Sequence, residues 1–179
     1  MSSTADPHGW VLEAVDLYEI PLLRYARRLL GDVDLAADAV QHAFVKLCAE
    51  SQARIGHRVA PWLFHVCRNR ALDHLRRSGR EHTLSDDRDT ASPTTPAGRE
   101  ADPSLLAERA DLARRLRGLL ADLPASQRES IDLWCEGLTY REIAGVTGRQ
   151  EGHIRVLVHR GLTALRNHPA IRELLPAQA

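Results

Sequence analysis

A polar segment divides this chain into two parts with separate patterns of apolar residues. From Gly79 to Asp102 the sequence is rich in Pro, Thr, Ser, Gly and Asp and contains a single Leu. Such a segment buries too little apolar surface to offset the entropy lost on ordering, so we predict a flexible acidic linker over residues 81–102. On either side, apolar residues recur at helical spacing. We therefore predict an all-α fold of two small helical domains, residues 10–80 and residues 103–170.

The first block opens with the periodicity of helices. From Trp10 to Leu30, apolar residues recur every three or four positions, with Pro21 as a candidate break between two helices. Gly31 is a natural C-cap, and Asp32 or Asp34 is expected to cap the helix that follows. The apolar stripe of this following helix is Ala36, Val40, Ala43, Phe44 and Leu47.

A further helix of the first block is expected near Pro61, after a loop over residues 51–58. Proline suits the first turn of a helix because its missing N–H would have no partner there. The predicted helix has an apolar side and is otherwise rich in arginine. Its apolar residues are Trp62, Leu63, Val66, Cys67, Ala71 and Leu75.

The second block begins with a helix that is expected to start at Asp102-Pro103 and to repeat leucine at helical spacing as far as Leu123. Pro124 ends this helix. A second, shorter helix is predicted over residues 126–136, and Gly137 closes it.

The segment over residues 137–166 has the pattern of a helix-turn-helix motif. Thr139 followed by Glu142 forms a capping box, which starts the first helix of the motif. Ala144 is small enough for a second helix to approach closely. Gly148 follows four residues later and can adopt the positive φ that a tight turn requires.

The second helix of this motif is expected to begin near Gln150 or Glu151. Its inward positions are Ile154, Leu157 or Val158, and Leu165. In such motifs the second helix enters the major groove, where Arg pairs with guanine and Gln with adenine, while other cations bind phosphates. The predicted DNA-binding residues are Arg149, Gln150, His153, Arg155, His159 and Arg160. The alternative is a helical hairpin with a solvated basic face.

Charge is unevenly distributed along a chain whose net charge is zero. Residues 53–80 carry seven arginines against one acid, and residues 149–179 carry five arginines against two acids. Between them, residues 81–111 carry three arginines against eight acids. Two basic patches therefore flank an acidic segment, and a local positive potential attracts polyanions even when the total charge is zero.

Other classes of protein find little support in the sequence. No signal peptide is visible, and no apolar stretch approaches the roughly 20 residues that span a bilayer. No ligand spacing for zinc and no glycine-rich phosphate loop is present, so we expect no catalytic residue, metal, cofactor or small-molecule substrate. Cys48, Cys67 and Cys135 fall at apolar positions of predicted helices, and we expect buried thiols in a reducing, cytoplasmic compartment.

Two sets of residues in this chain occur together in a known family. One set, over residues 119–166, is Leu123, Pro124, Arg128, Gly137–Tyr140, Glu142–Ala144, Gly148, Gly152, Ile154, His159, Arg160, Leu165 and Arg166. The other, over residues 18–80, is Tyr25, Ala26, Leu30–Asp32, Asp38–Gln41, Phe44, Trp62–Phe64, Arg68, Asn69, Asp73, Arg76 and Arg77. They resemble region 4 and region 2 of the extracytoplasmic-function sigma factors of the sigma-70 family.

The resemblance implies a non-enzymatic protein that binds core RNA polymerase and directs it to promoter DNA. The second domain would bind the −35 element through the helix-turn-helix. The implied polymerase-binding residues are Asp38, Gln41 and Phe44, and the implied −10 DNA-binding residues are Trp62, Arg68, Asn69, Arg70, Asp73, Arg76, Arg77 and Arg80. Phe44 and Trp62 are alternatively core residues, and Asp73 is alternatively a local ion-pair partner of Arg76 or Arg77. An anti-sigma factor is a further candidate partner, whereas no membrane partner is expected.

The recognition helix departs from the family pattern. Thr147 and Arg149 flank Gly148 where relatives usually have apolar residues, and Val156-Leu157 stands where relatives usually have Ser-Arg. An Arg missing at Leu157 would remove a phosphate contact. These differences indicate either an unusual −35 sequence or weak DNA binding by the second domain.

Three other interpretations compete with this one. A helix-turn-helix regulator of the LuxR type would bind duplex DNA without joining polymerase, but the arginine-rich helix of the first block fits −10 binding better. An enzyme would need a site that the sequence does not provide. A helical adaptor without a nucleic-acid role is disfavoured by the two arginine patches.

Overall fold

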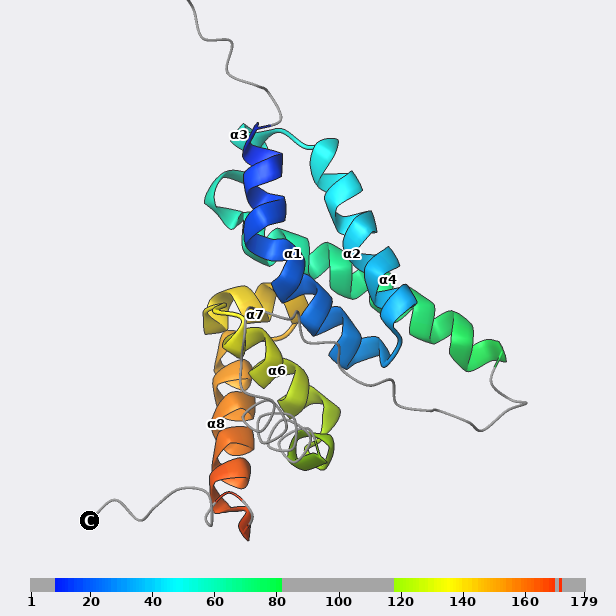
Figure 1. Cartoon of the computed structure of the whole chain (residues 1–179). Coiled ribbons are helices and arrows are strands. Elements are labelled where there is room, and N and C mark those ends of the chain that lie inside the picture. The colour runs from blue at the N-terminus through cyan, green and yellow to red at the C-terminus, as the bar shows by residue number, and fades with distance from the viewer. Residues whose placement is uncertain (1–8, 82–117, 170, 172–179) are drawn as a thin grey trace, which may run out of the picture.

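The computed structural model describes residues 9–81, 118–169 and 171, and these residues are helical without any strand (Figure 1). The first module consists of α1 (Gly9–Leu30), α2 (Val33–Cys48), α3 (Gln52–Ile55), a 3₁₀ turn η1 (Gly56–Arg58) and α4 (Val59–Glu81). The second module consists of α6 (Ala125–Cys135), α7 (Tyr140–Thr147) and α8 (Glu151–Asn167). Residues 118–121 are also helical. The predicted linker beyond Glu81 and most of the leucine-rich helix lie outside the described residues.

The helix α1 continues through Pro21, so the expected break at this residue was wrong. Proline has no N–H to donate to the preceding turn, which costs the helix one hydrogen bond. Buried residues on both sides hold the helix together, with Ala14 before the proline and Leu22 and Tyr25 after it. Tertiary packing thus outweighs the local preference of one residue.

The capping residues between α1 and α2 are the ones that the sequence predicted. Gly31 has a φ of 72°, and its N–H bonds to the carbonyl oxygen of Arg27 at 2.8 Å. Asp32 is the N-cap, since its carboxylate accepts a hydrogen bond from the N–H of Leu35 at 2.9 Å. The prediction of a loop over residues 51–58 was wrong, because α3 and η1 occupy this segment. Each is about one turn long, and a single turn carries too few residues to show periodicity.

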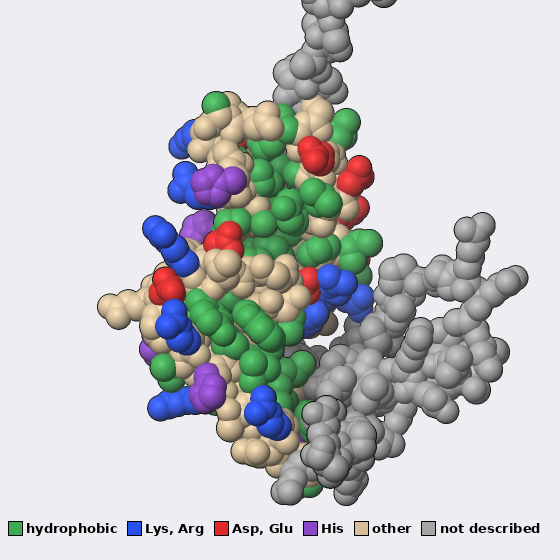
Figure 2. Space-filling view, turned by 90° about the vertical axis from the view of Figure 1, so that its left-hand side faces the viewer, with side chains coloured by type: hydrophobic (Ala, Val, Ile, Leu, Met, Phe, Trp, Pro, Cys, Tyr) green, Lys and Arg blue, Asp and Glu red, His purple; other side chains and the backbone are tan. Residues whose placement is uncertain are grey.

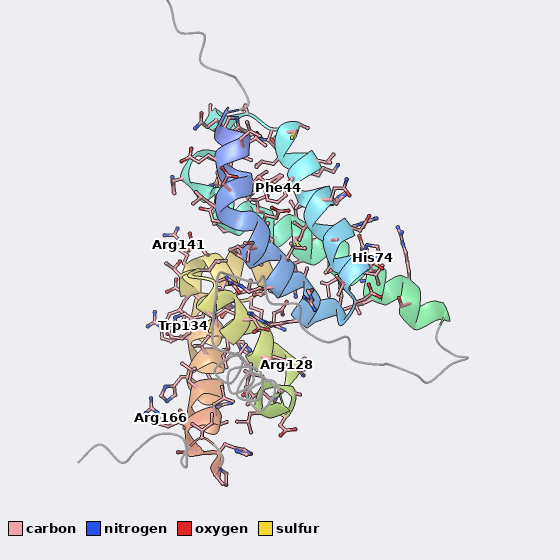
Figure 3. All side chains as sticks on the ribbon, viewed as in Figure 1. Phe44, His74, Arg128, Trp134, Arg141 and Arg166 are labelled. Atoms are coloured by element: carbon pink, nitrogen blue, oxygen red, sulfur yellow. The ribbon has the colours of Figure 1, made fainter. Side chains whose placement is uncertain are left out.

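The core of the first module lies where α1, α2 and α4 cross. Tyr25 and Phe64 meet edge to face, with ring centroids 5.5 Å apart, and both are almost completely buried. Phe44 is half-buried between α1 and α2 and packs against this core (Figure 3). Burial raises the pKa of Cys67 to about 12. Cys48 and Cys135 are exposed, which corrects the expectation that all three thiols are buried.

The second module contains the predicted helix-turn-helix. Thr139 and Glu142 form both hydrogen bonds of the capping box at the start of α7. Gly148 has a φ of 71° at the turn between α7 and α8. Leu157 and Val158 are both buried, so α8 uses both of the inward positions that the sequence offered.

The two modules are in contact. The helix α4 lies against α7, and α1 lies against α6 (Figure 1). Buried residues of both modules, such as Leu63 and Leu133, belong to one continuous cluster. None of the described helices is long and apolar enough to cross a bilayer.

Candidate nucleic-acid interface

The outward side of α8 carries most of the predicted −35 residues. These exposed residues are Gln150, His153, Arg155, His159 and Arg160. The side chain of Arg155 is 65% exposed, pairs with Glu151 at 3.1 Å, and lies 5.7 Å from the ring centre of Tyr140. A neighbouring acid and ring hold this guanidinium in place while leaving it open to solvent. This side of α8 can therefore meet a phosphate backbone or base edges.

The buried side of α8 fixes which residues face outward. Ile154, Leu157 and Val158 pack into the module, and Gly161 lets α8 approach α6. Leu157 is therefore a core residue here. Of the Val156-Leu157 pair, which replaces the usual Ser-Arg of relatives, only Val156 changes the outward surface, because it is 46% exposed.

Arg149 differs from the other predicted −35 residues. It is half-buried at the turn before α8, and its guanidinium lies 3.4 Å from a carboxylate oxygen of Glu129 on α6. Its charge is therefore partly neutralised within the protein.

On α4, Arg68 lies at the contact between the two modules. Its Nε donates to Glu129 at 2.7 Å, and its side chain is only 15% exposed. Burial alone would lower the pKa of Arg68, but the hydrogen bond and charge of Glu129 raise it, so the guanidinium stays charged. The sequence pattern predicted the arginine but not this partner, which lies 61 residues away.

Asn69 and Trp62 lie near an open cleft between α4 and α7. The Asn69 amide is 3.0 Å from Nε2 of His65, whose Nδ1 is 3.3 Å from the carbonyl oxygen of Val146 on α7. The cleft has a volume of about 800 Å³, and Trp62 is half-buried in its wall. Cationic residues that the sequence analysis missed also line it: Arg54, Arg58 and Arg141. The excess of arginine over residues 53–80 was the sequence signal that could have identified Arg54 and Arg58 as interface residues.

The remaining arginines of α4 point to different neighbours. The Nε of Arg70 donates to Asp38 on α2 at 2.8 Å, away from the second module. Arg76 pairs with Asp73 at 2.9 Å, which is the local pair that the helical spacing offered as an alternative. Arg77 is exposed. The side chain of Arg80 is not among those described. The predicted −10 set therefore does not gather on one face of α4.

The predicted polymerase-binding residues of α2 also differ in how exposed they are. Gln41 is exposed, whereas Phe44 packs inward. Asp38 accepts hydrogen bonds from Arg70 and His74, both at 2.8 Å, and these bonds hold the pKa of its carboxyl below its ordinary value. Val45 is 61% exposed and follows Gln41 by four residues, so the two share a face of α2. The sequence analysis missed Val45, although its helical spacing from Gln41 is visible there.

One face of the molecule shows how charge and apolar surface are arranged. Figure 2 shows basic and histidine side chains along one edge of both modules, beside a strip of hydrophobic side chains. Exposed apolar residues of α1 are Leu12, Leu17 and Ile20. Within the described ranges, no group of three or more His, Cys, Asp and Glu residues is arranged to hold a metal ion.

Comparison with protein families identifies both modules. Sigma-70 region 2 matches residues 14–81, and Sigma-70, region 4 matches residues 113–165. The chain is 31% identical to the RNA polymerase sigma factor CarQ of Myxococcus xanthus, over 86% of this chain and 89% of CarQ. It is 26% identical to the ECF RNA polymerase sigma factor SigM of Bacillus subtilis, over 86% of this chain and 91% of SigM.

A solved structure shares this arrangement of helices. It is the sigma factor RpoE in complex with the anti-sigma factor NepR from Bartonella quintana, which matches with a TM-score of 0.67 and 26% identity. The match covers 89% of this chain and 95% of that chain. The resemblance in sequence and in structure thus extends over both modules.

Proposed function

The chain belongs to the extracytoplasmic-function sigma factors of the sigma-70 family, and from this membership we propose how its two modules divide promoter recognition. As a sigma factor it binds core RNA polymerase and directs promoter-specific transcription initiation. We assign polymerase docking and the −10 element to residues 10–80, and the −35 element to residues 103–170. The observation that carries this division is the exposed basic side of α8, set on a capped helix-turn-helix and joined in one chain to an arginine-rich helical bundle.

Docking on polymerase is assigned to the outward face of α2. Gln41 and Val45 offer one polar and one apolar side chain to a partner, and Asp38 lies one turn before Gln41. Such a mixed surface is typical of a specific protein interface. Phe44 supports this face from the core side.

The −10 element is assigned to α4 and the segment before it. A melted strand needs donors for its base edges, an aromatic surface and cations along its backbone. Asn69 and Trp62 offer the first two. The cations of this proposal are Arg68, Arg70, Arg76, Arg77 and Arg80, with Asp73 orienting Arg76.

The −35 element is assigned to the first turns of α8 and the residues before it. Arg149, Gln150, His153 and Arg155 would meet base edges, and His159 and Arg160 would follow phosphates. No catalytic step is assigned to the chain, because binding energy alone opens the duplex. Initiation requires the chromosome, so we place the chain in the cytoplasm. The NepR complex of RpoE supports an anti-sigma factor as a further partner.

Run-off transcription tests this function. Core RNA polymerase with the purified chain, on a library of genomic fragments, should yield transcripts that core polymerase alone does not. Absence of new start sites together with failure of core polymerase to retain the chain would contradict the proposal.

Docking has a separate test. Asp38→Ala with Gln41→Ala should weaken co-elution with core polymerase. Asp16→Ala with Gln52→Ala removes the same two side-chain types from exposed positions outside α2 and should leave co-elution unchanged. Equal retention of both double variants would remove Asp38 and Gln41 from the interface.

A further inference from the structure

Two side chains of α4 bind a single carboxylate of α2. The Nε of Arg70 donates to Oδ2 of Asp38 at 2.8 Å, and Nε2 of His74 lies 2.8 Å from the same oxygen. Arg70 and His74 are one helical turn apart, so they share the side of α4 that faces α2. Figure 3 shows His74 where α4 crosses the first half of α2. We call these three residues the Asp38 cluster.

The Asp38 cluster lies at the border between the α2–α4 contact and solvent. The side chains of Arg70 and His74 are 26% and 13% exposed, whereas that of Asp38 is 47% exposed. Packing therefore fixes the two donors, while the carboxylate that they hold stays open to a partner. Both bonds go to Oδ2 and neither uses Oδ1, so Oδ1 can accept a hydrogen bond from a partner at the same time.

The open side of Asp38 belongs to the face of α2 that is assigned to polymerase. Gln41 follows Asp38 by three residues and is exposed, and Val45 follows Gln41 by four residues and is 61% exposed. Arg70 was grouped with the −10 cations because it lies on α4. Its hydrogen bond nevertheless connects it to the docking face of α2.

The two bonds give Asp38 properties that suit a binding residue. A side chain that is already oriented binds a partner at a smaller cost in entropy than a mobile one. The same bonds hold the pKa of Asp38 below its ordinary value, so the carboxylate is charged at neutral pH. A partner that donates to Oδ1 would therefore meet a fixed, ionised acceptor. Removing either donor would leave this charge in place but release its orientation.

We propose that Arg70 and His74 are positioning residues for polymerase docking, which hold the Asp38 carboxylate in the orientation that core RNA polymerase binds. This inference rests on the proposed function, which places Asp38 on the docking surface. It gives Arg70 a role in docking besides the −10 contact assigned to it. His74, which the sequence analysis did not single out, affects docking only through Asp38.

The dissociation constant for core RNA polymerase tests each donor. His74→Phe keeps a ring but removes the donor, and Arg70→Ala removes the guanidinium. Each should weaken binding about two- to fivefold, the range expected for a half-exposed ionic contact. His74→Gln keeps an N–H that can reach Asp38 and should restore most of the loss. Arg54→Ala breaks an exposed pair with Glu50, which does not involve Asp38, and should leave binding unchanged.

A double-mutant cycle separates positioning from a general disturbance of α4. In an Asp38→Ala background the donors have no carboxylate to hold, so His74→Phe and Arg70→Ala should cause no further loss of affinity. The assay contains no DNA, so a contact of Arg70 with the −10 strand does not contribute to the result.

Two results would overturn the proposal. One is an equal loss of affinity with and without the Asp38 carboxylate, which would mean that the variants act on α4 itself. The other is wild-type affinity of both His74→Phe and Arg70→Ala. Retention of the wild-type chain by core polymerase, measured in the same experiment, reports separately on the proposed function.

Discussion

The helices α4 and α8 are both assigned to DNA, yet their cations are in opposite states. Arg68 on α4 is bonded to a carboxylate of the other module and is largely buried, whereas Arg155 on α8 is largely exposed. The two residues are alike in type and both lie on amphipathic helices. The difference arises from Glu129, which is distant from Arg68 in sequence. A basic helix is therefore available to DNA only if no acid elsewhere in the fold already occupies it.

The largest expected effect comes from the buried side of α4. Phe64→Ala should lower the free energy of unfolding by about 3–5 kcal/mol, because it removes a fully buried ring that contacts Tyr25. Urea unfolding measures this change. Trp134→Ala removes an aromatic side chain that is exposed at α6 and should cost much less. Equal losses in the two variants would contradict the packing described for α4.

The buried side of α8 depends on a glycine instead of a large ring. A Cβ added to Gly161 would lie 2.5 Å from Cδ1 of Ile131 on α6. Gly161→Ala should therefore destabilise the second module by roughly 1–3 kcal/mol of overpacking, less the helix propensity that alanine adds. Thermal unfolding measures the net change.

Two further variants isolate the clash at Gly161. Ile131→Val removes the clashing atom and should restore much of the stability that Gly161→Ala loses. Gly152→Ala lies on the same helix with open space around the added Cβ and should be neutral or stabilising. A loss of stability in Gly152→Ala equal to that in Gly161→Ala would show that close packing on α6 is not the cause.

Much of the second module could be predicted from sequence because its signals are local. Thr139, Glu142 and Gly148 act within a few residues of one another, and the structure shows the bonds and the positive φ they indicated. The contacts of Arg68 and Arg149 with Glu129 were not predictable in this way. An ion pair between segments that are distant in sequence depends on how the helices pack in three dimensions, and periodicity carries no information about that packing.

In the first module, too, local sequence preferences predicted the structure only in part. Pro21 indicated a break that tertiary packing overrides, and Phe64 was absent from the expected apolar stripe although it is almost completely buried. The predicted −10 residues came from one stretch of sequence, but a helix directs neighbouring side chains to different sides. Arg68 and Arg70 therefore face different partners.

The exposed side of α8 gives a smaller effect, confined to DNA binding. Arg155→Ala should weaken binding of −35 duplex by about 1–3 kcal/mol if this arginine pairs with a base. Co-elution with core polymerase should be unchanged, because α2 lies in the other module. Arg54→Ala removes an exposed arginine from the first module, which is not assigned to the −35 element, and serves as the charge control. Equal transcription from wild type and Arg155→Ala would exclude the predicted contact.

The smallest expected effect concerns Asp38 on α2, which binds Arg70 on α4. By contrast, the acid that pairs with Arg155 lies on the same helix, α8. The bonds from Arg70 and His74 lower the pKa of Asp38 from its ordinary value of 3.8 in the folded protein. A lowered folded pKa means that the contribution to stability is complete above the ordinary carboxyl pKa and disappears as the pH falls through the lowered value. Because the carboxylate is half exposed, Asp38→Asn should cost only about 0.2–1 kcal/mol at pH 7. Urea unfolding should show this difference at pH 7 and its loss in strong acid, and a difference that persists below the lowered pKa would mean that packing, not charge, links α2 to α4.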